Sequence, residues 1–198
     1  MTVKLTFSEY FDLEPEIIEE FGALDISIDS DLPLFIDPFL LFSSDKREYQ
    51  ELHDQIVNHL VNLREIAVKN GAVNERLFQF PEIKQNWLGL CKYGNQGRGL
   101  GPKFAKKIIS EFKGFYSNFG NETISEASHI EKLTLVGKGI GKDFISDFTT
   151  NLIFEYLLQY TAIFAEKYLD ENHTRKFTLR CNFDSKLGVW MPKEYKLP

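Results

Sequence analysis

Three oxygen-bearing side chains recur about once per helical turn in the segment KDFISDFTTN. Asp143, Asp147 and Asn151 stand at positions i, i+4 and i+8, a spacing that places them on one face of a helix. Carboxylate and amide oxygens at this spacing could hold one Mg²⁺, which could itself bridge to a phosphate. Asp143 and Asp147 are therefore candidate catalytic acids, and all three residues are candidate metal ligands. The alternative is that the stripe is the solvent face of an amphipathic helix, with Asp143 compensating the helix dipole.

A further acid, Asp37, follows the compact apolar segment LPLFI and precedes Pro38. Metal-dependent nucleases keep a ligand at the end of a buried strand, so Asp37 is a third candidate catalytic residue. The acid-x-Lys pair that such nucleases also carry occurs three times, but never inside a convincing strand. The Asp-Pro pair is equally typical of a turn or the first residue of a helix.

A glycine turn followed by lysines gives a second kind of chemistry in GRGLGPKFAKKII. Gly99 and Gly101 precede an expected helix, where free backbone N–H groups and the positive end of the helix dipole favour an anion. Lysines at the same end would add positive charge for a phosphate. The predicted phosphate-binding residues are Gly99, Gly101, Lys103, Lys106 and Lys107.

This segment, residues 97–109, resembles the helix-hairpin-helix DNA-binding motif. The motif has a glycine-hydrophobic-glycine turn that opens a helix, here Gly99-Leu100-Gly101, with Ala105 and Ile108 or Ile109 at the packing positions. The resemblance implies contact with nucleic-acid phosphates. The alternative interpretation is a flexible loop and a lysine-bearing solvent face.

A second glycine turn, GKGIG at residues 137–141, does not satisfy the stronger nucleotide-binding patterns. A P-loop needs Lys-Ser or Lys-Thr after its last glycine, whereas Lys142 is followed by Asp143. The dinucleotide-binding fingerprint needs a βαβ return, and the helix expected here is too long for it. The two turns also differ in charge, because lysines follow the first and aspartates follow the second.

Composition indicates an ordinary globular chain. The 198 residues are 43% hydrophobic and carry a net charge of −6, which argues against a protein that coats nucleic acid with its whole surface. The two cysteines, Cys91 and Cys181, are too far apart in sequence to suggest a disulfide framework, so we expect a cytoplasmic protein. We expect no membrane segment, no zinc site and no cofactor other than Mg²⁺.

The expected elements define an α+β fold, mainly helical, with a small sheet from N-terminal strands and a C-terminal β-hairpin. Apolar periodicity and end signals predict helices over about residues 15–21, 45–70, 102–119 and 142–169, with shorter helical pieces between 72 and 90. TVKLTF is expected to be a strand, and a hairpin is expected to turn near Asp184 and Ser185. We expect one globular domain over residues 1–198. Because the sequence stops at KEYKLP without a polar tail, the alternative is that it is the N-terminal part of a longer protein.

Taken whole, the chain resembles bacterial cytoplasmic proteins of unknown function, and its general appearance resembles proteins of anti-phage defence loci. The segments LPLFIDPFLL and GIGKDFISDFTTN match no established activity. The leading hypothesis is a nucleic-acid-binding module that contacts phosphates through the basic glycine turn. The second is a Mg²⁺-dependent nuclease or phosphotransfer enzyme using Asp143, Asp147 and Asp37. The third is a non-catalytic interaction or sensor domain that docks a protein partner.

Overall fold

A long helix, α4 (Arg47–Val68), forms one side of the main core in the computed structural model, which describes residues 4–69, 72–92, 94, 99–115, 142–184, 187 and 189–198. The predicted apolar face of this helix is buried: Leu52, Ile56, Leu60, Leu63 and Ala67. The helix predicted to begin at about residue 45 begins after Lys46, which makes no side-chain cap bond. Packing of the apolar face therefore fixes this helix.

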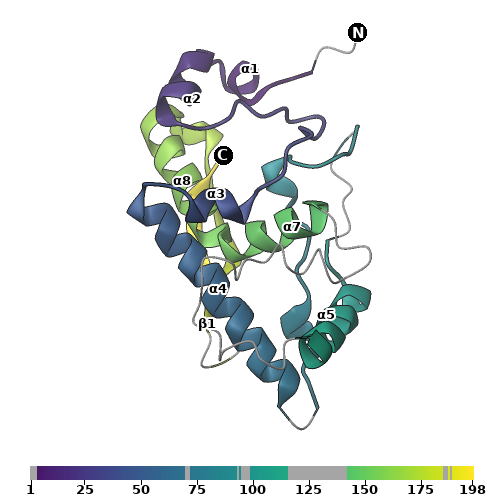
Figure 1. The fold of residues 1–198 in the computed structure, drawn as a ribbon. Coiled ribbons are helices and arrows are strands. Elements are labelled where there is room, and N and C mark those ends of the chain that lie inside the picture. Colours follow the sequence, from purple (N-terminus) through teal and green to yellow (C-terminus); the bar gives the residue numbers. More distant parts are fainter. Residues whose placement is uncertain are drawn as a thin grey trace.

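The rest of the main core comes from α5 (Pro102–Phe115), α7 (Lys142–Leu152) and the 3₁₀-helix η1 (Glu75–Phe78). Figure 1 shows α7 crossing the molecule between α4 and α5. Phe80 and Phe148, whose ring centroids are 4.5 Å apart, are both buried where these elements meet. A second 3₁₀-helix, η2 (Lys84–Asn86), follows in the chain segment that leads to α5.

The helix predicted over residues 142–169 is divided in two. After α7 the backbone leaves helical geometry at Ile153, and α8 (Phe154–Tyr168) continues to the short η3 (Glu171–His173). Ile153 is 4% exposed and belongs to the main core. The break has neither glycine nor proline, so the local sequence does not mark it.

Of the segment TVKLTF, which was predicted to be a strand, Thr6 forms an isolated antiparallel bridge with Ser27, and the helix begins at Phe7. Thr6 and Glu9 form a reciprocal capping box that starts α1 (Phe7–Phe11). α2 (Pro15–Phe21) follows as predicted and ends at Gly22, whose φ is 83°. Between them and α4 lies α3 (Pro38–Phe42). The Tyr160 hydroxyl of α8 donates to the Phe21 carbonyl oxygen, which anchors α2.

The sheet of the described chain is the predicted C-terminal hairpin, β1 (Arg175–Asp184) paired antiparallel with β2 (Val189–Leu197). The register shifts between Arg180 and Asn182, where β1 contains a bulge. The hairpin packs on α8, and Cys181, Tyr195 and Leu197 are buried with Leu158 in a second, smaller core. Helices plus this hairpin make an α+β fold, as predicted, although N-terminal segments contribute isolated bridges such as Thr6–Ser27 rather than strands.

Several predictions fall on residues outside the described ranges. These are the second glycine turn at 137–141, the end of the helix predicted to reach residue 119, and Ser185 in the predicted hairpin turn. Both cysteines are free thiols, as expected. No helix in the described part of the chain has the length and apolar character that a membrane crossing needs.

Candidate functional site at the glycine turn and the neighbouring hollow

The first glycine turn and the predicted acidic stripe lie against the same short segment, residues 80–83. Phe80 and Leu100 exchange two backbone hydrogen bonds, of 2.9 and 2.7 Å. On the other side, Asn151 Nδ2 of α7 donates to the Pro81 carbonyl oxygen at 2.9 Å. We call the region formed by residues 80–83, 99–101 and α7 the turn–α7 junction.

Gly99 is required by the geometry of this junction. Its φ is 58°, in the left-handed region, and a Cβ atom there would lie 2.3 Å from the Glu82 backbone nitrogen and 2.8 Å from the Phe80 oxygen. Gly101 differs, because a Cβ atom on it would meet no atom within 4 Å. The structure therefore requires a glycine at position 99 but shows no steric requirement for a glycine at position 101.

Two backbone donors of the turn already have partners inside the protein. The Gly99 N–H donates to Glu82 Oε2 at 2.9 Å, and the Leu100 N–H donates to the Phe80 oxygen. An internal carboxylate thus occupies the Gly99 donor that we predicted for a phosphate. Lys103 and Lys106 remain exposed on α5, while Lys107 is partly buried.

The buried face of α5 explains where its lysines point. The side chains that pack inward are Phe104, Ala105, Ile108, Ile109 and Phe112, and the Phe104 ring stacks on Phe144 of α7 with a centroid separation of 5.5 Å. The packing positions Ala105, Ile108 and Ile109 are therefore buried. The exposed lysines occupy the opposite face, at the end of α5 nearest the turn.

The polar stripe on α7 is not a solvent face. Asp143 is exposed and Asp147 is half-buried, but Asn151 is only 7% exposed, and Ser146, Thr149 and Thr150 are also buried. Ser146 Oγ accepts a hydrogen bond from the Ile36 N–H at 2.9 Å, and Thr150 Oγ1 donates to the Ser146 carbonyl oxygen. The alternative interpretation of the stripe, as a solvent-facing side, is therefore wrong beyond its first residue.

Asp147 is the ionisable group that this junction perturbs most. Burial raises its pKa to about 7, and the nearby carboxylates of Glu82 and Asp143 contribute in the same direction. Glu82 is the residue that the sequence did not single out, although it contacts the glycine turn and influences the acidic stripe. The junction therefore brings the carboxylates of Glu82 and Asp143 near enough to Asp147 to influence its ionisation.

Two of the other predicted site residues have structural partners. Asn151 Nδ2 donates to the carbonyl oxygens of Pro81 and Asp147, so its amide nitrogen holds α7 to residue 81. Asp37 Oδ1 accepts from the Phe39 N–H at 2.9 Å and caps α3. Within the described ranges, no group of three or more His, Cys, Asp or Glu side chains is arranged to hold a metal ion. The Mg²⁺ site remains a prediction.

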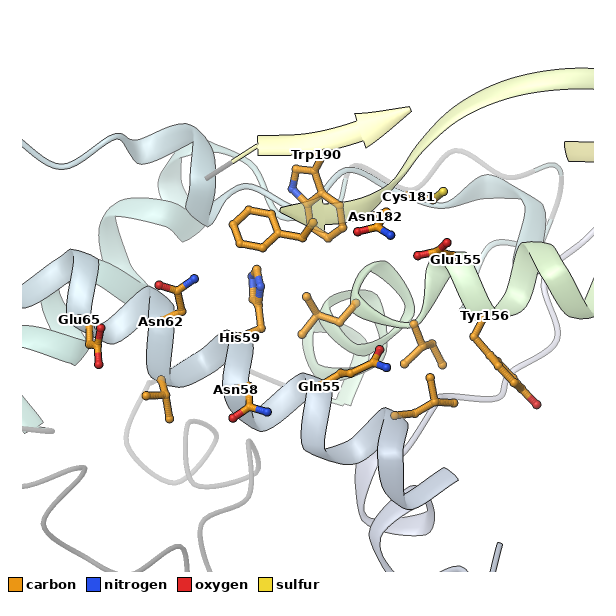
Figure 2. Close-up of a pocket in the computed structure, with 15 residues that line it drawn as sticks. Gln55, Asn58, His59, Asn62, Glu65, Glu155, Tyr156, Cys181, Asn182 and Trp190 are labelled. Atoms are coloured by element: carbon orange, nitrogen blue, oxygen red, sulfur yellow. The ribbon is translucent and has the colours of Figure 1, made fainter. Parts of the chain in front are cut away.

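A second candidate site, which sequence reasoning did not identify, is a hollow of about 600 Å³ between α4, the α7–α8 boundary and the hairpin. Figure 2 shows Gln55, Asn58, His59 and Asn62 on α4, with Asn182 and Trp190 opposite them. The three carboxamides on α4 recur every three or four residues, a pattern that could have marked a polar side of this helix.

His59 lies at the aromatic end of the hollow. Its ring centroid is 4.5 Å from Phe183 and 6.1 Å from Trp190, and burial lowers its pKa to about 4. Its Nε2 atom is buried without a hydrogen-bond partner among the described residues. His59 also packs near Phe80, with ring centroids 6.2 Å apart, so the hollow and the turn–α7 junction lie on either side of Phe80.

We compared the chain with known protein families, curated proteins and solved structures. A search of curated proteins and a search of solved structures each found no match. A family model matches residues 12–198, which is nearly the whole chain. The chain therefore belongs to the family described as "Domain of unknown function (DUF8370)".

Proposed function

We propose that the protein binds nucleic acid and contacts its backbone phosphates with lysines on the exposed face of α5, beside the Gly99 turn. The observation that carries the proposal is the position of Lys103 and Lys106, which are exposed at the end of α5 nearest the turn while the opposite face is anchored in the core. A rigid helix that presents cations in this way can follow a phosphate backbone.

The hydrogen bonds of the Gly99 turn affect which groups would contact a phosphate. Glu82 already accepts the Gly99 N–H, so lysine side chains, rather than the turn amides, would provide the attraction. The net charge of −6 over the whole chain would limit affinity for a polyanion. We therefore expect moderate binding that depends steeply on salt.

The test is fluorescence anisotropy of labelled single- and double-stranded DNA and RNA over a range of salt concentrations. Replacing Lys103 and Lys106 by glutamate should abolish binding at moderate salt, because it replaces two cations with two anions. The matched control is Lys46→Glu with Lys167→Glu, which makes the same charge change at exposed lysines near the start of α4 and the end of α8. Absent binding, salt-independent binding or equal loss in both double variants would contradict the proposal.

A second candidate function is a Mg²⁺-dependent nuclease or phosphotransfer activity at the turn–α7 junction. Its support is that Glu82 and Asp143 both raise the pKa of Asp147, although these three carboxylates do not form a described group arranged to hold a metal ion. Carboxylates that repel one another are stabilised when a hard cation shares them.

Cleavage of labelled DNA and RNA in the presence of Mg²⁺ tests this second candidate. Asp143→Ala and Asp147→Ala should each abolish the cleavage, and chelation of the metal should do the same. Asp170→Ala, at an exposed aspartate before η3 that makes no side-chain cap bond, is the control. Intact substrates, or cleavage that survives both junction variants, would contradict the activity.

A further inference from the structure

The hollow beside α4 presents uncharged hydrogen-bonding groups from two sides. Gln55, Asn58 and Asn62 line it from α4, with Asn58 at its edge, and Asn182 lines it from β1 (Figure 2). None of these four carboxamides has a hydrogen-bond partner in the described part of the chain. Each offers two N–H donors and one carbonyl acceptor, so the walls suit a ligand that carries donors and acceptors side by side.

Charge in the hollow opposes an anionic ligand. Its walls include the carboxylates of Glu65 and Glu155, and none of the described residues that line it is a lysine or an arginine. Glu155 accepts a hydrogen bond from Lys193 Nζ at 2.8 Å, so part of its charge is compensated. A phosphate group would meet the remaining negative charge, whereas a neutral ligand would not.

The aromatic end of the hollow provides an apolar surface and one unused polar atom. Trp190 and Phe183 have ring centroids 5.2 Å apart, and Figure 2 shows His59 pointing from α4 toward Trp190. His59 is 8% exposed, and its Nε2 atom has no partner among the described residues. A ligand that formed a hydrogen bond with this nitrogen would offset the free-energy penalty of burying it without a partner.

We propose that the hollow binds a neutral nucleobase, as a free base or nucleoside or as a base presented by a nucleic-acid strand. Asparagine and glutamine side chains make paired hydrogen bonds with base edges, and tryptophan and phenylalanine rings stack on base faces. The volume of about 600 Å³ lies inside the usual range for small-molecule sites. This site is separate from the lysines of α5, and the inference does not depend on phosphate binding there.

Isothermal titration calorimetry on the full chain tests the inference with adenosine, guanosine, cytidine and uridine. At least one nucleoside should bind with a Kd below about 1 mM, and its 5′-monophosphate should bind at least about fivefold more weakly because of the carboxylates. Gln55→Ala and Asn182→Ala should each weaken nucleoside binding by about tenfold or more. Both side chains are exposed, so neither variant should alter Tm appreciably.

The matched control is Gln159→Ala, because Gln159 is an exposed glutamine on α8 that does not line the hollow. It should leave nucleoside affinity unchanged. A short oligonucleotide that displaces the nucleoside, and loses affinity in Gln55→Ala, would identify a strand as the source of the base. The inference is overturned if no nucleoside or oligonucleotide binds, if binding is equal in all variants, or if neutral saccharides bind at Gln55 while nucleosides do not.

Discussion

The turn–α7 junction and the hollow beside α4 each bury one ionisable side chain, and the two side chains respond to pH in opposite ways. At the junction, burial together with Glu82 and Asp143 raises the pKa of Asp147 to about 7. In the hollow, burial lowers the pKa of His59 to about 4. The comparison shows that desolvation favours the uncharged form of an acid and of a base alike.

The pH ranges of these two effects overlap. Between about pH 4 and pH 6.5, both groups are neutral in the folded protein and charged in the unfolded chain. Unfolding would then release a proton from Asp147 and take one up at His59, so the two contributions to the pH dependence of stability nearly cancel. Variants that remove one group at a time should separate them.

The largest expected effect concerns the turn itself. Gly99→Ala should lower the free energy of unfolding by about 2–4 kcal/mol, because alanine is strained at a positive φ and its Cβ would collide with the backbone of residues 80–82. Urea denaturation of the purified variant measures the loss.

Gly101→Ala is the control for this substitution, since the space around Gly101 is open. Its free energy of unfolding should stay within about 1 kcal/mol of the parent protein. Equal losses in the two variants would show that the junction does not depend on the close approach at Gly99.

The next effect concerns the hollow. His59→Phe keeps an aromatic ring but removes the titratable nitrogens. Because the pKa of His59 is lowered on folding, the parent protein should lose stability as pH falls from about 6.5 to 4, by about 2–3 kcal/mol relative to His59→Phe. Urea unfolding of both proteins at pH 7 and pH 4 measures the difference, which a solvent-exposed imidazole would not produce.

The smallest effect concerns Asp147. Its pKa is raised on folding, so the parent protein should lose stability relative to Asp147→Asn as pH rises from about 4 to above 7. Its partial exposure reduces the expected difference at pH 8 to about 1–2 kcal/mol. If the stability difference between the parent and Asp147→Asn did not change with pH, Asp147 would have to be ionised normally in the folded protein.

The elements that the sequence predicted are those fixed by neighbouring residues. The apolar face of α4 and the end of α2 at Gly22 follow from patterns within a few helical turns. The break at Ile153 has no such pattern, because the apolar residues continue through it and tertiary packing decides the geometry. The start of α1 was missed for another reason: alternation in TVKLTF favoured a strand, whereas the Thr6–Glu9 capping box starts a helix.

The two candidate sites also differ in how far they depend on neighbouring residues and how far on tertiary contacts. The glycine turn is local and could be found from the sequence, but its partner Glu82 lies 17 residues from Gly99, and Pro81 lies 70 residues from Asn151. The hollow needs α4, the α7–α8 boundary and the hairpin to meet. The residues that line the hollow are common types, and they form a site only when these three elements pack together. Their spacing in the sequence therefore did not identify them.

The bulge in β1 has a consequence for how the hairpin can change. In a regular strand, consecutive side chains point to opposite faces, yet Cys181, Asn182 and Phe183 all line the hollow, because the register shifts between Arg180 and Asn182. Deleting Cys181 would restore alternation and withdraw part of this wall, while the pairs from Arg175–Leu197 to Arg180–Pro192 could keep their partners. In this hairpin, a one-residue change in length would alter the lining of the hollow more than most substitutions could.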